Sequence, residues 1–213
     1  MAVQRPLPER YTEHISKWGW SDELRSWTWP GLEGASLNVR VYTRGDRVRL
    51  LLNGKDVGAK ELSEKDALRA EFAVPYSPGE LKAVAYQDGQ EIGSITFNTV
   101  GKAHGVALTP DRAKLKADRD DLSYVMVRVV DEQGQTVPDA VIPVSFTVSG
   151  AGEIAAVGNA NPKDVASFRE PRRDTYHGVC AVIVRPTGKA GVIEVRAEAP
   201  GLSGETARSQ VGG

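Results

Sequence analysis

The side chains best suited to attack a substrate or bind a metal are one cysteine and three histidines: Cys180, His14, His104 and His177. Nucleophilic catalysis requires a nucleophile, a base and an orienting group brought together. Cys180 lies in an apolar stretch, so we expect a small buried hydrophobic residue rather than a reactive thiol. A lone cysteine cannot form a disulfide within the chain, and the histidines are too widely spaced for a zinc-binding pair. We therefore expect no catalytic residue, no metal site and no cofactor.

Two loops carry side-chain oxygen atoms at a spacing that could suit calcium. The first has three aspartates, and the second has two asparagines and an aspartate: Asp118, Asp120 and Asp121, then Asn159, Asn161 and Asp164. The first loop lacks the glycine and the distal glutamate of an EF-hand. Asparagine and aspartate are common in loops because they tolerate left-handed backbone. We expect solvated turns at both places, with a ligand role as the alternative.

Two further strings could bind phosphate. Gly150-Ala151-Gly152 is glycine-rich, but strand-like residues flank it and no helix follows, so we expect a tight turn. A small basic cluster farther along could hold a phosphate or a sulfated sugar, although its acidic neighbours favour ion pairs on the surface. The cluster comprises Arg169, Arg172 and Arg173, with Glu170 and Asp174 beside them.

The tryptophans are gathered near the start of the chain. All four precede the first clear strand pattern: Trp18, Trp20, Trp27 and Trp29. Planar aromatic rings can stack on the apolar faces of sugar rings, which makes Trp27 and Trp29 candidate carbohydrate contacts. We favour packing against a neighbouring domain, because indole rings are costly to leave in water.

Composition limits the kinds of partner. The chain has 213 residues, with 28 acidic and 27 basic side chains and a net charge of -1. This balance argues against a dedicated nucleic-acid binder and against a polybasic membrane anchor. The first residues offer too short an apolar stretch for a signal peptide, and no apolar run reaches the length of a membrane span. We expect no nucleic acid and no membrane among the partners.

The residues after the tryptophans read as β-structure. Apolar and polar side chains alternate with the period of a half-buried strand. Strands are expected over residues 37–41, 48–52, 68–75, 80–87 and 91–98. Turns are signalled by Asn53-Gly54, Pro78-Gly79 and Asp88-Gly89.

The same kind of pattern restarts beyond residue 102. Strands are expected near residues 106–108, 125–129, 144–148, 178–185 and 192–199. The run 178–185 is almost continuously apolar, as expected for a central strand covered on both sides. Turn signals every 8–12 residues indicate a β-sandwich.

The chain is thus predicted to contain two β-sandwiches. The expected borders are 1–34 for a lead-in segment, 35–102 for the first sandwich and 103–213 for the second. Ser21–Arg25 could form one helical turn in the lead-in, with Ser21 as its cap.

Several motifs resemble glycoside hydrolase family 2 β-galactosidases. The first half is similar to the region after the catalytic barrel, and the second half to the C-terminal immunoglobulin-like domain that follows. The motifs are Ser26–Gly31, Val39–Thr43, Leu51–Lys55, Val74–Tyr86, Asp121–Val125, Val137–Ala140 and Val157–Pro162. The resemblance covers roughly residues 18 to 205. Ala160 departs from it, since a glycine often stands there in the family, and alanine would be strained at a positive φ.

The resemblance implies an all-β fold of two tandem immunoglobulin-like β-sandwich domains preceded by an irregular Trp-rich segment. Family 2 enzymes retain configuration with two glutamates about 5 Å apart on a TIM barrel. The βα alternation of a barrel is missing here, so no glutamate takes either role. The implied function is a non-catalytic C-terminal accessory fragment of a β-galactosidase, in a structural or active-site-rim role. Its implied partners are the catalytic barrel and the N-terminal domains of that enzyme.

Two other functions stay open. One is a carbohydrate-binding module that contacts a galactoside-containing glycan through Trp27 and Trp29. The other is a surface immunoglobulin-like spacer or adhesin. The compartment is open as well, with a periplasmic or secreted setting favoured slightly for a polysaccharide-degrading enzyme.

Overall fold

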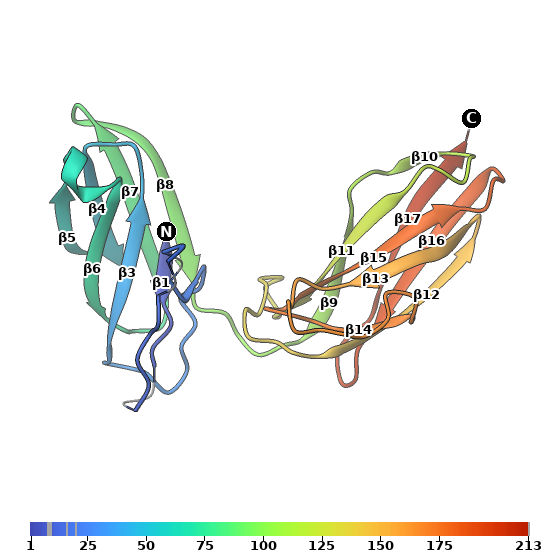
Figure 1. Cartoon of the computed structure of the whole chain (residues 1–213), viewed down its shortest axis with the longest axis horizontal. Helices are drawn as coiled ribbons and strands as arrows, with labels where there is room; N and C mark the ends of the chain where they lie inside the picture. The colour runs from blue at the N-terminus through green and yellow to red at the C-terminus, as the bar shows by residue number, and fades with distance from the viewer. Residues whose placement is uncertain (8–9, 16, 20, 213) are drawn as a thin grey trace. The chain divides into compact units, whose positions relative to one another are not determined.

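The computed structural model describes residues 1–7, 10–15, 17–19 and 21–212, and the chain divides into two compact units (Figure 1). Unit 1 comprises Met1–Thr99 and unit 2 comprises Val100–Gly213. Both are built from β-sheets, which confirms the all-β prediction. No helix in the described ranges has the length and apolar character needed to cross a membrane.

Unit 1 is a sandwich of two four-stranded sheets, with strand orders β2-β1-β3-β6 and β5-β4-β7-β8. The strands are β1 Ala2–Gln4, β2 Glu23–Leu24, β3 Ser36–Tyr42, β4 Arg47–Leu52, β5 Lys55–Glu61, β6 Arg69–Pro75, β7 Glu80–Gln87 and β8 Gln90–Asn98. A short 3-10 helix, Glu64–Asp66, lies between β5 and β6. Val39 and Phe72 from one sheet meet Leu50 and Leu81 from the other in a single buried cluster.

The hairpins of unit 1 follow the predicted turn chemistry. Asn53 and Gly54 turn β4 into β5 with φ values of 52° and 75°. Asp88 and Gly89 turn β7 into β8 in the same way. Residues of these types adopt positive φ at little cost, which is what a two-residue hairpin turn requires. Alternation predicts Leu68 in the next strand, but Leu68 has a φ of 62°, is mostly exposed and belongs to the turn before β6.

The lead-in segment contributes more to the sandwich than its sequence indicates. Val3 pairs with Val39 of β3 and is fully buried, so β1 extends the sheet. Glu23–Leu24 pairs with β1, which makes the predicted helical turn over Ser21–Arg25 wrong. Sheet pairing and burial of Val3 outweigh the local capping signal of Ser21. The other described lead-in residues are irregular, as expected, and Trp20 lies outside the described residues.

Unit 2 is also a sandwich. Its sheets have strand orders β10-β17-β16-β12-β14 and β13-β15-β11-β9. The strands are β9 Gly105–Pro110, β10 Lys114–Lys116, β11 Ser123–Val130, β12 Pro143–Gly150, β13 Gly152–Gly158, β14 Arg172–Asp174, β15 Val179–Pro186, β16 Gly191–Glu198 and β17 Glu205–Gly212. All pairs are antiparallel except that of β10 with β17.

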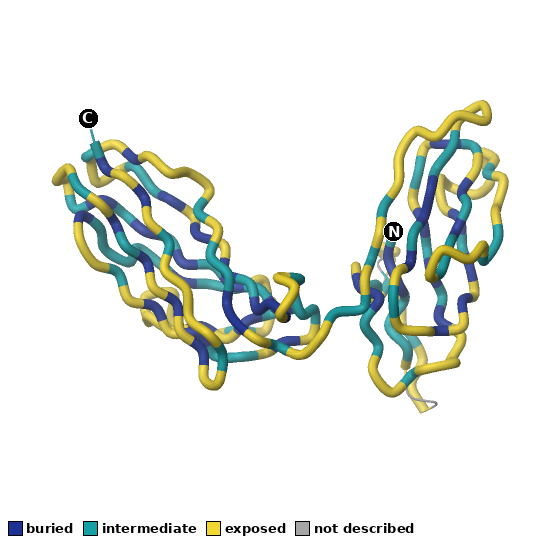
Figure 2. The backbone as a smooth tube through the Cα atoms, turned by 180° about the vertical axis from the view of Figure 1, so that it is seen from behind, coloured by how far each residue is buried: buried dark blue, intermediate teal, exposed yellow. Residues whose placement is uncertain are grey.

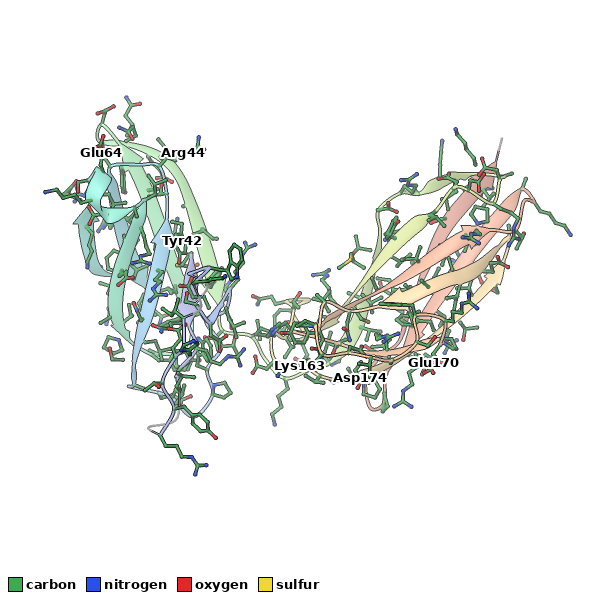
Figure 3. The ribbon with its side chains drawn as sticks, in the orientation of Figure 1. Tyr42, Arg44, Glu64, Lys163, Glu170 and Asp174 are labelled. Atoms are coloured by element: carbon green, nitrogen blue, oxygen red, sulfur yellow. The ribbon has the colours of Figure 1, made fainter. Side chains whose placement is uncertain are left out.

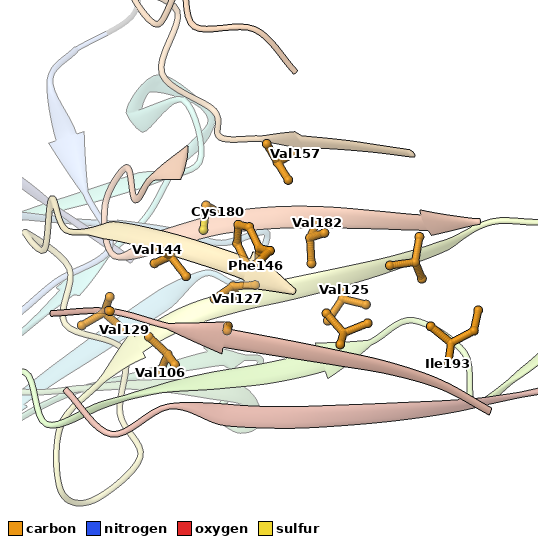
Figure 4. Close-up of a cluster of buried hydrophobic side chains, with 14 of the residues drawn as sticks. Val106, Val125, Val127, Val129, Val144, Phe146, Val157, Cys180, Val182 and Ile193 are labelled. Atoms are coloured by element: carbon orange, nitrogen blue, oxygen red, sulfur yellow. The ribbon is translucent and has the colours of Figure 1, made fainter. Parts of the chain in front are cut away.

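The core of unit 2 lies between its two sheets (Figure 4). Val127 and Val182 project into it from one sheet, and Phe146 and Ile193 from the other. Buried and less buried residues alternate along the strands of the tube in Figure 2. β15 is an inner strand as predicted, but its alternate residues are only half-buried. Its outer face is therefore less completely covered than a continuous apolar run indicates.

Candidate functional site

Trp27, one of the two predicted carbohydrate contacts, lies inside the core of unit 1. Its side chain is fully buried, and the indole Nε1 donates a hydrogen bond to the carbonyl of Ser77 at 3.0 Å. The ring meets Tyr76 edge to face, with 5.1 Å between the ring centroids. A stacked sugar needs an open ring face, so burial corrects the expectation for Trp27 and assigns it to packing within its own unit.

Trp29 is in a different position. It is half-buried, and its backbone N–H donates to the hydroxyl of Tyr76 at 3.1 Å. Its indole Nε1 is buried and has no hydrogen-bond partner in the described part of the chain. Trp27 and Trp29 thus do not present two rings side by side to a ligand, and a sugar contact by Trp29 alone stays a prediction.

A polar cluster fastens the lead-in segment to the sheet of unit 1. Arg40 pairs with Glu23 and, at 3.1 Å, with Glu71. Tyr42 donates its hydroxyl hydrogen to Glu23 Oε2 at 2.7 Å. Burial would raise the pKa of Glu23, but hydrogen bonds from Ser21, Arg40 and Tyr42 hold that pKa below its usual value. A carboxylate held ionised by its donors anchors the segment and is poorly suited to act as an acid.

Two of the three aspartates of the first acidic loop, Asp118 and Asp121, are already engaged by hydrogen bonds within the protein. Asp118 Oδ1 accepts the backbone N–H groups of Asp120 and Asp121 at 3.0 and 2.8 Å. Asp121 accepts the N–H of Lys116 at 2.8 Å and pairs with Arg112 at 3.1 Å. Within the described ranges, no group of three or more acidic, histidine or cysteine side chains is arranged to hold a metal ion. The loop is a hydrogen-bonded turn.

Cys180 and the glycine string take structural roles, as the sequence predicts. Cys180 faces the core of unit 2, and burial raises its thiol pKa to about 12, so it is protonated at neutral pH. Gly150 has a φ of 80° at the turn between β12 and β13, and a Cβ there would lie 2.1 Å from the carbonyl oxygen of Val192. The turn leads into a strand, so it lacks the helix start that a phosphate loop uses.

The second polar loop surrounds a hollow of about 680 Å³ in unit 2, which we call the polar hollow. It lies beside the segment from β13 to β14 and the residues after β14. Figure 3 labels Lys163, Glu170 and Asp174, which line it. Asn159, Asn161 and Asp164 line it too, so the structure brings the second polar loop and part of the basic cluster together. The polar hollow is the candidate site.

Arg173 supports the polar hollow from below the surface. It is only 3% exposed, and it binds Asp164 Oδ2 at 2.9 Å and the carbonyl of Ser167 at 2.6 Å. It also donates to the carbonyls of Val157 and Ala166 at 3.3 and 3.2 Å. The expectation of a surface ion pair with Glu170 or Asp174 is therefore wrong for Arg173. Arg169 and Arg172 are exposed.

Asn159 and Asp164 complete this network. Asn159 Nδ2 donates to Asp164 Oδ2 at 2.9 Å and to the carbonyl of Asp174 at 2.8 Å. The backbone N–H of Ala166 and the Arg173 guanidinium hold the pKa of Asp164 below its usual value. Ala160 does not adopt a positive φ, so alanine is tolerated where the family often has glycine. The loop is fixed in shape by its own hydrogen bonds.

The carboxyl groups show the same electrostatic pattern throughout the described residues. Every one whose pKa is clearly shifted is shifted downward: Glu23, Asp66, Asp111, Asp121, Asp131 and Asp164. A general acid needs a raised pKa so that it keeps its proton near neutral pH. The shifted carboxyl groups are stabilised as bases by hydrogen bonds and cations, the opposite of what acid catalysis requires.

Comparison with protein families gives two matches. Residues 106–208 match the model described as glycoside hydrolase family 2 C-terminal domain 5. Residues 34–93 match a domain of unknown function, DUF4982. The first match lies within unit 2 and the second within unit 1.

Comparison with individual proteins also gives matches to glycosidases. The chain is 38% identical over 178 residues to β-galactosidase BoGH2A of Bacteroides ovatus, across 83% of this chain and 20% of that protein. It is 28% identical over 171 residues to a β-glucuronidase of Formosa agariphila, across 79% of this chain and 17% of that protein. A solved glycosyl hydrolase family 2 member from Bacteroides cellulosilyticus superposes with a TM-score of 0.91 and 33% identity, across 99% of this chain and 28% of that one.

These shares show that the chain spans less than a third of the length of the proteins it matches. The matched glycosidases differ in the sugar that their names specify.

Proposed function

Because the chain belongs to the C-terminal region of glycoside hydrolase family 2, we propose that it is a non-catalytic accessory part of a β-galactosidase. Its role would be structural: covering the catalytic barrel or shaping the rim of the active site. Its partners would be the catalytic barrel and the N-terminal domains of that enzyme.

The observation that carries this proposal is the state of the carboxyl groups. Retaining hydrolysis needs two carboxyl groups about 5 Å apart, one of them held protonated until it donates to the leaving group. In the polar hollow, Asp164 is paired with buried Arg173 and its pKa is lowered. The ionised form of Asp164 is thus favoured, so it is unsuited to donate a proton to a glycosidic oxygen.

The fold supports the proposal as well. Both sandwiches are filled by apolar side chains, from Val39 and Leu50 in unit 1 to Val127 and Ile193 in unit 2. Catalytic residues of a TIM barrel stand at the carboxyl ends of parallel strands. The one parallel pair among the described strands, β10 with β17, lies at the edge of a five-stranded sheet. Such a pair offers no ring of strand ends on which to mount an acid and a nucleophile.

β-Galactosidase is favoured over β-glucuronidase by sequence identity. The galactosidase relative is 38% identical, against 28% for the glucuronidase.

A turnover assay tests the proposal. The purified chain is incubated with nitrophenyl β-galactoside and, in parallel, with nitrophenyl β-glucuronide. We expect no release of nitrophenol above buffer with either substrate, while a full-length family 2 β-galactosidase serves as the positive control. Enzymatic release that survives further purification of the chain would overturn the accessory role.

A further inference from the structure

A second hollow adjoins the polar one. It has a volume of about 330 Å³ and lies on the outer face of β11, β13 and β15, where Met126, Phe168 and Ile183 line it; we call it the apolar hollow. Asn159 and Tyr176 line both hollows. An aromatic ring and a planar amide therefore stand where an apolar wall meets a polar one.

The polar hollow contains hydrogen-bonding capacity that the protein does not use. Asn159, Asp164 and Arg173 are engaged with one another and with the backbone, as described above. Five other polar side chains in its wall have no hydrogen-bond or ion-pair partner in the described part of the chain: Lys163, Glu170, Arg172, Asp174 and the hydroxyl of Tyr176. Together they offer both donors and acceptors to a ligand.

The charges that line the polar hollow cancel. Three are positive and three are negative: Lys163, Arg172 and Arg173 against Asp164, Glu170 and Asp174. A phosphate, a uronic acid or a cation would gain no net attraction there. An uncharged ligand with many hydroxyl groups suits a hollow lined by equal numbers of positive and negative side chains, because each hydroxyl both donates and accepts hydrogen bonds.

We propose that unit 2 binds a neutral saccharide at the junction of the two hollows. The His177 ring packs against Tyr176, with 4.1 Å between the ring centroids. One sugar ring lies with its apolar C–H face against the part of the Tyr176 ring that His177 leaves uncovered, and its hydroxyls bond the unused side chains of the polar hollow. Ligand sites combine apolar and aromatic walls with a few polar groups in this way. The aromatic contact of this site is Tyr176 in unit 2, and it is separate from the sugar contact predicted for Trp29 in unit 1.

The site is held in shape before a ligand arrives. Arg173 ties together the carbonyls of Val157, Ala166 and Ser167 across the loop. Phe168 lies directly over Gly158, where a Cβ would approach the Phe168 ring to 3.2 Å. A preformed loop loses little freedom on binding, which favours affinity. Sugar binding is additional to the structural role proposed above, and its failure would leave that role intact.

Titration of the isotope-labelled chain, followed by the amide spectrum, tests the proposal. The probes are lactose, cellobiose and xylobiose, with sodium glucuronate as the charged comparison. At least one neutral disaccharide is expected to shift amides within residues 159–176 in a saturable way, and glucuronate is expected to shift them less. Absence of saturable shifts with all three disaccharides would overturn the proposal. So would shifts confined to unit 1, or a stronger response to glucuronate.

Variants of Tyr176 localise the contact. Tyr176→Ala is expected to weaken binding about tenfold, because the stacked ring is lost. Tyr176→Phe keeps the ring and loses one hydrogen bond, so about threefold weaker binding is expected. Tyr124→Ala is the matched control, since Tyr124 is an exposed tyrosine of unit 2 that lines neither hollow.

Lys163→Ala is a second variant of the site, chosen so that weaker saccharide binding cannot be explained by a loss of folding. Lys163 is exposed and has no side-chain partner in the described chain, so its removal should preserve the amide spectrum outside the site. We expect Lys163→Ala to weaken binding as well. Wild-type affinity in both Tyr176→Ala and Lys163→Ala would overturn the assignment of the site.

Discussion

The buried guanidinium of Arg173 determines how the loop between β13 and β14 is held, and its removal has a calculable effect. Arg173→Ala leaves the carbonyls of Val157, Ala166 and Ser167 without this donor. Only the Val157 carbonyl is buried, whereas Ala166 and Ser167 are exposed and water can replace the lost donor there. A buried acceptor left unpaired costs about 1 to 3 kcal/mol, so we expect a loss of about 2 kcal/mol in the free energy of unfolding. The contact with Asp164 adds less, because that carboxylate lies near the solvent edge.

The distribution of tryptophan provides the assay. All four tryptophans belong to unit 1, so fluorescence excited at the indole band reports unit 1 alone, whereas circular dichroism reports both units. Arg173→Ala should lower the thermal midpoint of unit 2 by about 7 °C while the fluorescence transition stays unchanged. Arg172→Ala is the matched control, with an expected effect within about 0.5 kcal/mol, because Arg172 is exposed and adjacent. Equal midpoints for the two variants would refute the reasoning.

The same pair of residues predicts a dependence on pH. The N–H of Ala166 and the guanidinium of Arg173 lower the pKa of Asp164 in the folded state. A carboxyl group with a lowered folded pKa stabilises the protein above its unfolded pKa, near 4, and that contribution is lost as the pH falls through the folded value. The difference in stability between the wild type and Arg173→Ala should therefore be largest near neutral pH and narrow in acid. A difference that grows as the pH falls would contradict this assignment.

Three further predictions concern single side chains. Trp27→Ala should destabilise unit 1 by about 3 to 5 kcal/mol in a denaturant titration followed by circular dichroism. Trp18→Ala, at a site 75% exposed, should cost less than about 0.5 kcal/mol, and similar costs for the two variants would contradict burial of Trp27. Cys180, with its thiol pKa raised to about 12, should react with Ellman's reagent only after unfolding, and rapid stoichiometric reaction in the native state would contradict this. Gly150→Ala should destabilise unit 2 by about 1 to 2 kcal/mol more than Gly188→Ala. Both glycines have positive φ, but only at Gly150 would a Cβ clash with a backbone carbonyl oxygen, so equal losses would argue against the clash.

Period-2 alternation and turn chemistry predicted most of the strands. The segments 37–41, 80–87 and 125–129 lie within β3, β7 and β11, because each buries one face of a sheet. The pair Asn53-Gly54 predicted its hairpin because few other residues accept two consecutive positive φ angles. These are local properties, so sequence reasoning reaches them.

The lead-in strands depend on contacts distant in sequence and could not be predicted in this way. β1 has only three residues, and its pairing is decided by β3, more than thirty positions later. No period can be read from so short a segment. Trp27 is similar, since its core position is set by Tyr76 and by the carbonyl of Ser77.

The candidate site shows the same limit. Sequence reasoning selected Asn159, Asn161 and Asp164 as a polar loop but placed Arg173 on the surface with its acidic neighbours. β14 pairs with β12 so that Arg173 stands opposite Val144, and this register turns its side chain inward. A three-residue strand with charges at every position gives no apolar signal of that register. Tyr176, half-buried between the two hollows, carried no motif at all.

The domain borders at residues 34/35 and 102/103 are still proposals. The second border lies close to the division of the compact units at Thr99/Val100.

The most direct test of the accessory role is a search for a glycosyl-enzyme intermediate. A retaining glycosidase forms a covalent bond between a carboxylate and the sugar, and a 2-fluoro galactosyl fluoride would accumulate that species. Intact-mass spectrometry of the chain after incubation with this reagent is predicted to show the unmodified mass alone. A single added fluorogalactosyl group, located on one aspartate or glutamate, would show that the chain contains a catalytic nucleophile and would contradict the account.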